Sequence, residues 1–358
     1  MRLAVADAGL YWADVDGLLI SRSPVAAADS LTPRLQYAAG MRDLRLLACV
    51  ESQGASAVVM LHLAALALAD GTARTIMCVF ADAPVRADQG GGAAFGAPRP
   101  VAGLSGLEAA AGWFGAATSY ALAARRHMAL FGTTGDQLGA VAVAARQWAA
   151  MNPNAWQREP LTLDQYHQSR WVVEPFHLFD CAFPVNGGIA VVVTTADRAR
   201  DLRQPAVHVC GLGQSHPGTP RRAGYEPDVD IGARAAGERA FRQAGITVRD
   251  IDVFECYDAF TYLTLVALEG YGFCERGEGG PFVASGAIAP GGALPSNTGG
   301  GQLASGYLQG MTPIAEAVVQ IRGHGDARQV ADCEFALVTG QGGRFDHHAA
   351  AIFGRAAS

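Results

Sequence analysis

Lysine is absent from the 358 residues of this chain, and arginine supplies all 27 of its basic side chains. Without a side-chain amine, the chain can form no lysine Schiff base, no covalent link to pyridoxal phosphate and no lysine-dependent phosphate loop. The 33 acidic residues outnumber the arginines, which gives a formal net charge of −6. With no basic run to offset this balance, we expect neither nucleic acid nor an anionic membrane surface as a ligand.

Paired cysteines and long hydrophobic runs are also missing. The seven cysteines lie far apart, and no Cys-x-x-Cys pair occurs. We therefore expect reduced, mostly buried thiols and no zinc site. The longest mostly apolar stretch, residues 55–69, is shorter than a bilayer span, and the N-terminal residues lack the layout of a signal peptide. The prediction is a cytoplasmic protein without a membrane span.

Half of the residues are hydrophobic, which is enough for a large core in one big domain or two compact ones. Strand-like and helix-like segments alternate, which predicts mainly parallel sheets with helices on their faces. Residues 55–69 form a helix that is apolar on nearly every side, so we expect it inside the protein, followed by a strand at 75–81. Residues 90–107, rich in glycine, alanine and proline, are predicted to form a long loop.

A second α/β pattern fills the C-terminal half. It has helices at 231–244, 259–271 and 312–322, and strands at 251–255, 335–339 and 349–353. A weak repeat relates the two halves, since SQGASA, a helix, ADGTART and a strand parallel SGYLQG, a helix, GHGDARQ and a strand. Two superposable halves explain this repeat. The predicted boundaries are 1–204, with a loop insertion around 87–170, and 205–358.

Polar residues gather where predicted strands end, which is where α/β proteins place their sites. Tyr257 and Asp258 lie between a strand and a helix; alternatively, Asp258 caps that helix and Tyr257 is a packing residue. Asn297 precedes the glycines 299–301, whose backbone amides can approach a ligand oxygen closely, and Tyr307 follows them. The alternative for this second cluster is a flexible surface loop.

A third cluster contains adjacent histidines, His347 and His348, after a strand. Neighbouring side chains of a strand point to opposite faces, so this pair cannot ligate one ion together. We therefore expect no metal site here.

The order and spacing of these motifs resemble the thiolase superfamily over nearly the whole chain. The likeness is to sterol-carrier-protein-type thiolases and to bacterial lipid-transfer-protein homologues, and it rests on PLTLDQYHQSRW to TTADRARDL, GEGGPFV, SNTGGG and VTGQGG. It implies an α/β thiolase fold, with two similar βαβαβαββ halves in a five-layer α/β/α/β/α arrangement. Because the chain opens on a helix-like segment, we expect the first strand at the N-terminus to be missing.

The residues on which thiolase chemistry depends are replaced. Glu51 stands where the family has its nucleophilic cysteine, and Cys49 lies two residues earlier, in the strand. Tyr307 matches the catalytic histidine, and Gly340 matches the second cysteine. With Tyr257 in the Tyr-Asp-Ala-Phe motif, this pattern resembles the thiolase-like aldolases of steroid side-chain degradation.

That resemblance implies retro-aldol cleavage of a bulky β-hydroxyacyl-CoA to a ketone and a short acyl-CoA such as propionyl-CoA. Coenzyme A enters as part of the substrate, and no covalently bound cofactor or metal is implied. The resemblance also implies a homodimer core within a heterotetramer, completed by a small subunit with an OB-fold and a zinc ribbon.

Retro-aldol cleavage requires a base for the β-hydroxyl proton, an oxyanion site for the thioester enolate and an acid for the enolate carbon. Tyr257 and Tyr307 are the predicted acid–base pair, in an order that stays open. The predicted oxyanion and substrate residues are Asn297, Gly300, Gln53, Gly54 and Asp258. Two alternatives remain: a thiolase-type acyltransferase that uses an unexpected residue, and a non-catalytic subunit that binds acyl-CoA or lipid.

Overall fold

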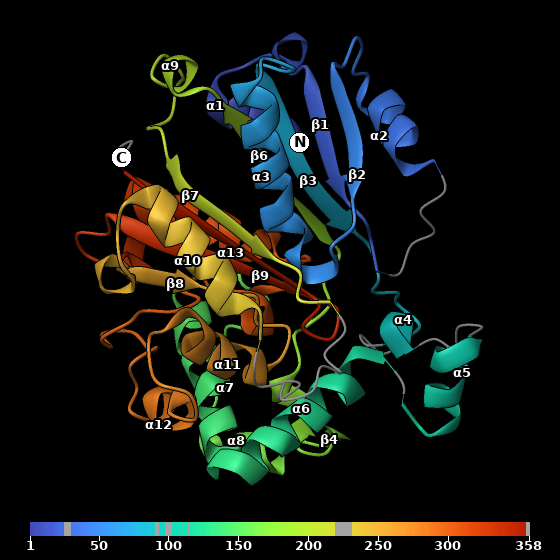
Figure 1. Ribbon diagram of the computed structural model, residues 1–358, viewed down its shortest axis with the longest axis vertical. Helices are drawn as coiled ribbons and strands as arrows, with labels where there is room; N and C mark the ends of the chain where they lie inside the picture. The colour runs from blue at the N-terminus through green and yellow to red at the C-terminus, as the bar shows by residue number, and fades with distance from the viewer. Residues whose placement is uncertain (25–29, 90–92, 97–101, 114, 219–230, 356–358) are drawn as a thin grey trace.

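The computed structural model describes residues 1–24, 30–89, 93–96, 102–113, 115–218 and 231–355. Two four-stranded sheets form its framework (Figure 1). The first sheet has the order β2-β1-β3-β6, with β1 (Gly17–Ser21), β2 (Leu46–Val50), β3 (Thr75–Asp82) and β6 (Gly187–Thr194). The second has the order β7-β10-β9-β8, with β7 (His208–Ser215), β8 (Val253–Glu255), β9 (Phe335–Gly342) and β10 (His347–Gly354).

The two sheets follow the same plan. In the first, β1 and β3 are parallel and β6 is antiparallel to β3. In the second, β8 and β9 are parallel and β10 is antiparallel to β9. β10 also pairs with β7, whereas no strand in the described part of the chain pairs with the outer edge of β6. Over the described ranges, both sheets thus have four strands, but the first has no counterpart of β7 and the second has no counterpart of β2. A missing first strand stays a prediction.

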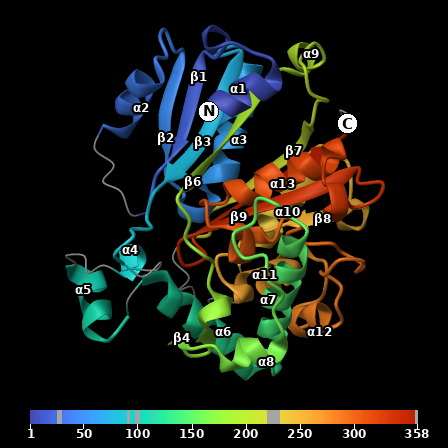
Figure 2. The same ribbon diagram turned by 180° about the vertical axis from the view of Figure 1, so that it is seen from behind.

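Helices α3 (Ser56–Ala69) and α13 (Met311–Arg322) lie between the sheets and contact strands of both (Figures 1 and 2). α1 (Arg2–Ala8) and α2 (Leu31–Ala39) pack on the first sheet, and α10 (Ala233–Ala244) packs on β7 and β10. The largest apolar core joins the two sheets through the two central helices. The layers thus follow the predicted order.

The central helix α3 is only partly enclosed. Residues 56–61 and Ala64 are buried, but Leu63 is 38 % exposed and Leu66 is 58 % exposed. The expectation of a helix buried on every side is therefore correct for its first half and wrong for its second half. There, no described residue covers the outward side chains.

Local sequence explains where several helices begin and end. Thr134 accepts a hydrogen bond from the backbone N–H of Gln137, and the Gln137 side chain accepts one from the N–H of Thr134, so the two form a capping box before α7 (Gly135–Ala150). α10 and α13 end at Gly245 and Gly323, which take left-handed φ values of 69° and 73° that favour glycine.

The segment between β3 and β6 contributes a largely helical insertion. It contains α4 (Ala93–Gly96), α5 (Gly103–Ala110), α6 (Gly115–Phe131), α7, α8 (Leu163–Gln168), β4 (Trp171–Val173) and β5 (Phe176–His177). The predicted loop at 90–107 was therefore wrong in part, because α4 and the start of α5 fall in it.

Smaller elements join the two halves and interrupt the C-terminal one. α9 (Ala196–Ala199) links the halves, while α11 (Thr261–Tyr271), α12 (Gly279–Ala284) and a π-helical turn at Gly301–Ser305 belong to the second. The boundary predicted at 204/205 falls between β6 and β7, and it stays a prediction. No helix in the described ranges is both long enough and apolar enough to span a bilayer.

Candidate active site

Two tyrosine side chains meet in the C-terminal half. Tyr257 follows β8, and Tyr307 lies between the π-helical turn and α13. Their hydroxyl oxygens are 3.0 Å apart, and their rings meet nearly edge to face. The Tyr307 hydroxyl also donates to Gln309 Oε1. The structure thus brings together the two residues predicted as an acid–base pair.

Glycine backbone leaves room for the buried ring of Tyr257. A Cβ atom on Gly54, just before α3, would lie 2.6 Å from Tyr257 Cε2. A Cβ on Gly310, which precedes α13, would lie 3.3 Å from Tyr257 Cδ2. The N-terminal ends of both central helices therefore flank this ring, and their partial positive charge favours negative charge on a nearby oxygen.

Burial makes both phenols weaker acids than ordinary tyrosines. Burial raises the pKa of Tyr257 well above its ordinary value, and neighbouring Tyr307 raises it further. Burial also raises the pKa of Tyr307, to about 12, although the hydrogen bond from Tyr257 opposes that rise. Both pKa values are thus raised, so both side chains are neutral phenols at neutral pH.

Asp258 holds the π-helical turn in place. Its carboxylate accepts hydrogen bonds from the backbone N–H groups of Gln302, at 2.8 Å, and Leu303, at 3.3 Å. A Cβ on Gly301 would lie 2.7 Å from Asp258 Cγ, so glycine is needed there. The N-cap of α11 is Phe260, so the alternative in which Asp258 caps that helix is wrong. Burial raises the pKa of Asp258 to about 7.

Asn297 and Gly300, predicted as oxyanion or substrate residues, both make hydrogen bonds within the protein. Asn297 Oδ1 accepts from the backbone N–H of Cys256 at 2.8 Å, and Nδ2 donates to Cys256 Sγ at 3.5 Å. The N–H of Gly300 donates to the carbonyl of Asn297 at 2.8 Å. These bonds stabilise the turn before Tyr257 and the loop after Asn297, and a contact of either residue with substrate stays a prediction.

The predicted residues Gln53 and Gly54 occupy the start of α3. Gln53 Oε1 accepts from the backbone N–H of Gly343 at 3.0 Å, which ties this turn to the β9–β10 connection. Gly54 contributes bare backbone beside Tyr257 and Gly310. Sequence reasoning missed Gln309, which accepts from Tyr307, and placed Gln302 in the second cluster without giving it a role. The only signal for these two was their place on either side of Tyr307.

The insertion walls the outer side of the tyrosine pair. Phe95 of α4 packs edge to face on Tyr307, with ring centroids 5.7 Å apart. Arg344, in the β9–β10 connection, forms a bidentate ion pair with Glu108 of α5, with both N···O distances 2.8 Å. Its guanidinium also stacks 3.9 Å from the ring centroid of Trp113. These contacts fix α5 and the segment after it to the C-terminal half.

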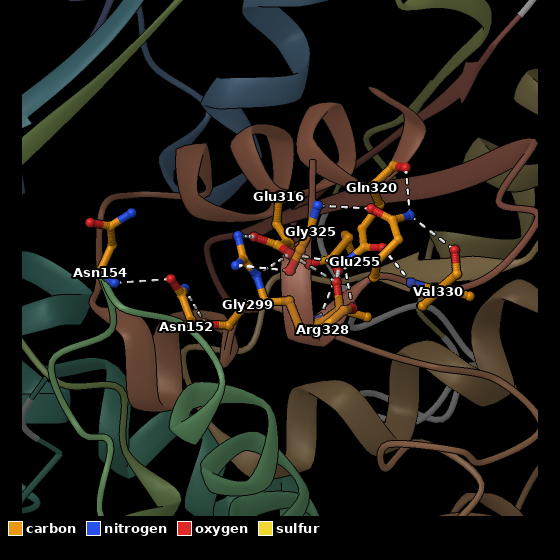
Figure 3. Close-up of polar contacts among 11 residues, drawn as sticks. Asn152, Asn154, Glu255, Gly299, Glu316, Gln320, Gly325, Arg328 and Val330 are labelled. Carbon is orange, nitrogen blue, oxygen red and sulfur yellow. Dashed lines mark hydrogen bonds and ion pairs between the residues drawn. The ribbon is translucent and has the colours of Figure 1, made fainter. Parts of the chain in front are cut away.

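A buried charged network lies beside Gly299, in the glycine-rich loop (Figure 3). Arg328 pairs with Glu316 at 2.8 and 3.2 Å, and Thr298 Oγ1 lies 2.8 Å from Glu255 Oε1 and 3.2 Å from Glu316 Oε1. Burial, and then Glu316, raise the pKa of Glu255 well above its ordinary value. The network thus holds one guanidinium for two buried carboxyl groups, and Thr298 donates to Glu255.

Asn152 continues the support of this loop, because its Nδ2 donates to the carbonyl of Gly299 at 2.8 Å (Figure 3).

Two side chains at and near the position of the family's nucleophile are exposed. Cys49 is exposed on β2, and partial burial together with Glu51 raises its pKa. Glu51, at the position of the family's nucleophile, is exposed and pairs with Arg22 at 2.8 Å. His347 contacts His216, whereas buried His348 contacts the carbonyl of Phe345. Within the described ranges, no group of three or more potential metal ligands occurs.

Known proteins resemble this chain over most of its length. The family model "Thiolase C-terminal domain-like" matches residues 225–355. A steroid side-chain-cleaving aldolase from Thermomonospora curvata is 36% identical, over 94% of this chain and 87% of the relative. A 17-hydroxy-3-oxo-4-pregnene-20-carboxyl-CoA lyase from Mycobacterium tuberculosis is 37% identical, over 94% of this chain and 88% of the relative.

Solved structures agree with these relatives. The Ltp2-ChsH2(DUF35) aldolase matches with a TM-score of 0.86 and 35% identity, covering 98% of this chain and 90% of that chain. A monomeric SCP2-thiolase-like protein from Mycobacterium smegmatis matches with a TM-score of 0.72 over 97% of this chain and 69% of that chain. At 18% identity, the second match bears on the fold alone.

Proposed function

This chain belongs to the thiolase superfamily, among the thiolase-like steroid side-chain-cleaving aldolases, and from that premise we propose that it is a carbon–carbon lyase acting on a β-hydroxyacyl-CoA. The bond between the α and β carbons breaks, the β-hydroxyl oxygen becomes a ketone, and the electron pair moves into the thioester enolate. Protonation of the α carbon then gives a short acyl-CoA. The 3.0 Å contact between the hydroxyls of Tyr257 and Tyr307 is the observation that carries this proposal.

The tyrosine pair supports a proton relay. One tyrosine accepts the β-hydroxyl proton while its own proton passes to the other, and that second tyrosine delivers a proton to the α carbon. Either hydroxyl can donate in the hydrogen bond that joins them, so the relay can run in either direction. Because each phenol receives a proton as it gives one up, no free phenolate is needed. This matters because an ordinary tyrosine titrates near about pH 10 and burial shifts it upward.

The thioester serves as its own electron sink, so the reaction requires neither a Schiff base nor an acyl-enzyme. No observation favours the acyltransferase alternative. The position of the family's nucleophile holds Glu51, ion-paired to Arg22, and burial raises the pKa of Cys256, the thiol next to Tyr257 in sequence. A thiol must be deprotonated to act as a nucleophile.

We also propose the substrate class and the assembly. The substrate carries a bulky, steroid-like ketone-forming part, in keeping with the names of the two curated relatives. A small DUF35-type subunit, with an OB-fold and a zinc ribbon, completes the acyl-CoA site of a homodimeric core, in keeping with the DUF35 component named in the solved aldolase. Coenzyme A enters as part of the substrate, and the cytoplasm is the proposed location.

The test is ketone release from a β-hydroxyacyl-CoA by the chain co-expressed with a DUF35-type subunit. Tyr257→Phe and Tyr307→Phe should each lower turnover by roughly 10²- to 10⁴-fold, because each removes one proton carrier. Tyr271→Phe is the matched control, since that buried hydroxyl donates only to the carbonyl of Ala349. Turnover at the wild-type rate in either pair variant would overturn the proposed mechanism.

A further inference from the structure

One buried side chain near the tyrosine pair has an unused hydrogen-bond donor. Gln302 has no exposed surface, and its Oε1 accepts from the backbone N–H of Gly310 at 2.8 Å. Its Nε2 finds no acceptor in the part of the chain that the structure describes. Leaving a buried donor unsatisfied costs about 1–3 kcal/mol, and native proteins do so rarely.

The orientation of this carboxamide is fixed by its partner. The N–H of Gly310 requires an acceptor, so the oxygen of the amide must face it and the nitrogen must point away. Exchanging the two atoms would place two donors against each other. The unpaired donor is therefore a property of the local backbone.

The backbone around Gln302 also positions both tyrosines. The N–H of Gln302 donates to Asp258, directly after Tyr257, at 2.8 Å. The carbonyl of Gln302 accepts from the N–H of Phe183 at 3.3 Å, and the carbonyl of Phe183 accepts from the N–H of Tyr307 at 2.8 Å.

The π-helical turn that carries Gln302 is a rare element, often found at functional sites. Gly310, to which the carboxamide is bound, lies against the ring of Tyr257 and the carbonyl of Gly54. A single hydrogen bond therefore links the carboxamide to the backbone that lies against the ring of Tyr257, where α3 and α13 begin.

We propose that Gln302 Nε2 donates a hydrogen bond to the thioester oxygen of the acyl-CoA and to the enolate oxygen that forms there on cleavage. This inference rests on the proposed function. Asn297 and Gly300, which the sequence predicted as oxyanion donors, already have hydrogen-bond partners within the protein. Gln302 Nε2 has none among the described residues. A preorganised donor in a site that excludes water is most effective where charge develops.

Two variants separate the donor from the structural bond of the same side chain. Gln302→Glu keeps an oxygen for the N–H of Gly310 and replaces the amide nitrogen, while Gln302→Met keeps the length and removes both polar atoms. Gln243→Met is the matched control, because Gln243 Oε1 likewise accepts a backbone N–H, that of Leu212 at 2.9 Å, on a helix of the outer layer. Thermal unfolding midpoints confirm that each variant is folded.

The first readout is exchange of the α protons of propionyl-CoA with deuterium from D₂O, followed by NMR. This exchange forms the enolate without any β-hydroxy substrate. Both Gln302 variants should slow it by roughly 10²- to 10³-fold, the usual effect of losing one oxyanion donor. The Gln243 variant should exchange at the wild-type rate. Wild-type exchange in both Gln302 variants would overturn the inference.

The second readout is binding of propionyl-CoA against its thioether analogue, in which CH₂ replaces the carbonyl, measured by calorimetry. The wild-type preference for the thioester should shrink in both Gln302 variants. If the wild type cleaves no β-hydroxyacyl-CoA but shows this Gln302-dependent preference, the proposed function fails and the inference stands. If the wild type cleaves its substrate but shows no such preference, the inference fails and the proposed function stands.

Discussion

Gly54→Ala tests whether the position of Tyr257 depends on bare backbone at the start of α3. The added Cβ would lie 2.6 Å from Tyr257 Cε2, and closer still to Cζ and to the carbonyl oxygen of Gln341. Gln341 lies within β9, so that carbonyl has little freedom to move. The start of α3 must therefore shift away from β9, and the tyrosine ring must give way as well.

The size of the effect follows from the clash. Restoring an ordinary contact of 3.4 Å at Cε2 moves the ring by about 0.8 Å, and the hydroxyl at its far end by roughly 1 Å. A shift of that size separates the two hydroxyls, now 3.0 Å apart, beyond hydrogen-bond distance. We expect a loss of turnover of about 10²-fold and a fall of about 1–3 kcal/mol in the free energy of unfolding.

The assay compares ketone release and urea unfolding for the wild type, Gly54→Ala and Gly135→Ala. Gly135 is the matched control, because a Cβ there would meet only His167 Cε1, at an ordinary 3.5 Å. The control should keep wild-type turnover. Wild-type turnover in Gly54→Ala would show that the position of the tyrosine ring does not control the chemistry, and the reasoning would be refuted.

Two further measurements test the charge states inferred for buried groups. Iodoacetamide should label exposed Cys49 and leave turnover unchanged, because burial raises the pKa of thiols such as Cys256. Mass spectrometry locates the label. A loss of activity that follows labelling of Cys49 would contradict the thiol-independent mechanism. Burial raises the pKa of Asp258 to about 7 and that of Asp180 to about 6, so the native state binds more protons than the unfolded state between about pH 4 and 7. The free energy of unfolding should therefore fall as the pH rises from 5 to 8, and it should fall less steeply in Asp258→Asn than in the wild type. Urea unfolding at several pH values measures this dependence. Equal pH dependence in the wild type and the variant would contradict the expectation.

The fold could be predicted wherever an apolar pattern marks an element, and the predicted thiolase fold is confirmed. The helix predicted at 55–69 and the strand at 75–81 match α3 and β3 within one residue. The glycine-rich segments gave no such pattern, because glycine lacks a side chain that would mark a buried face. The short helices α5 and α12 in those segments were consequently missed.

For the site, the sequence located the tyrosines but not their hydrogen-bonding surroundings. Tyr257 and Tyr307 stand at motif positions that can be read from the chain alone, and the structure adds their 3.0 Å contact. Asn297 has the right chemistry for an oxyanion donor, but whether its amide is free depends on the backbone path of Cys256. The unpaired donor of Gln302 likewise depends on the N–H of Gly310, which no residue pattern reveals.

The tyrosine pair and the wall formed by the insertion come from different segments of the chain. Tyr257 and Tyr307 both come from the C-terminal half, whereas Phe95 and Glu108 reach the site from a segment between two strands of the other half. Changes of sequence in α4 and α5 can therefore reshape the outer wall without displacing either hydroxyl. Relatives that share the tyrosine pair are free to diverge in the acyl groups they accept, and the insertion is where such divergence should be sought.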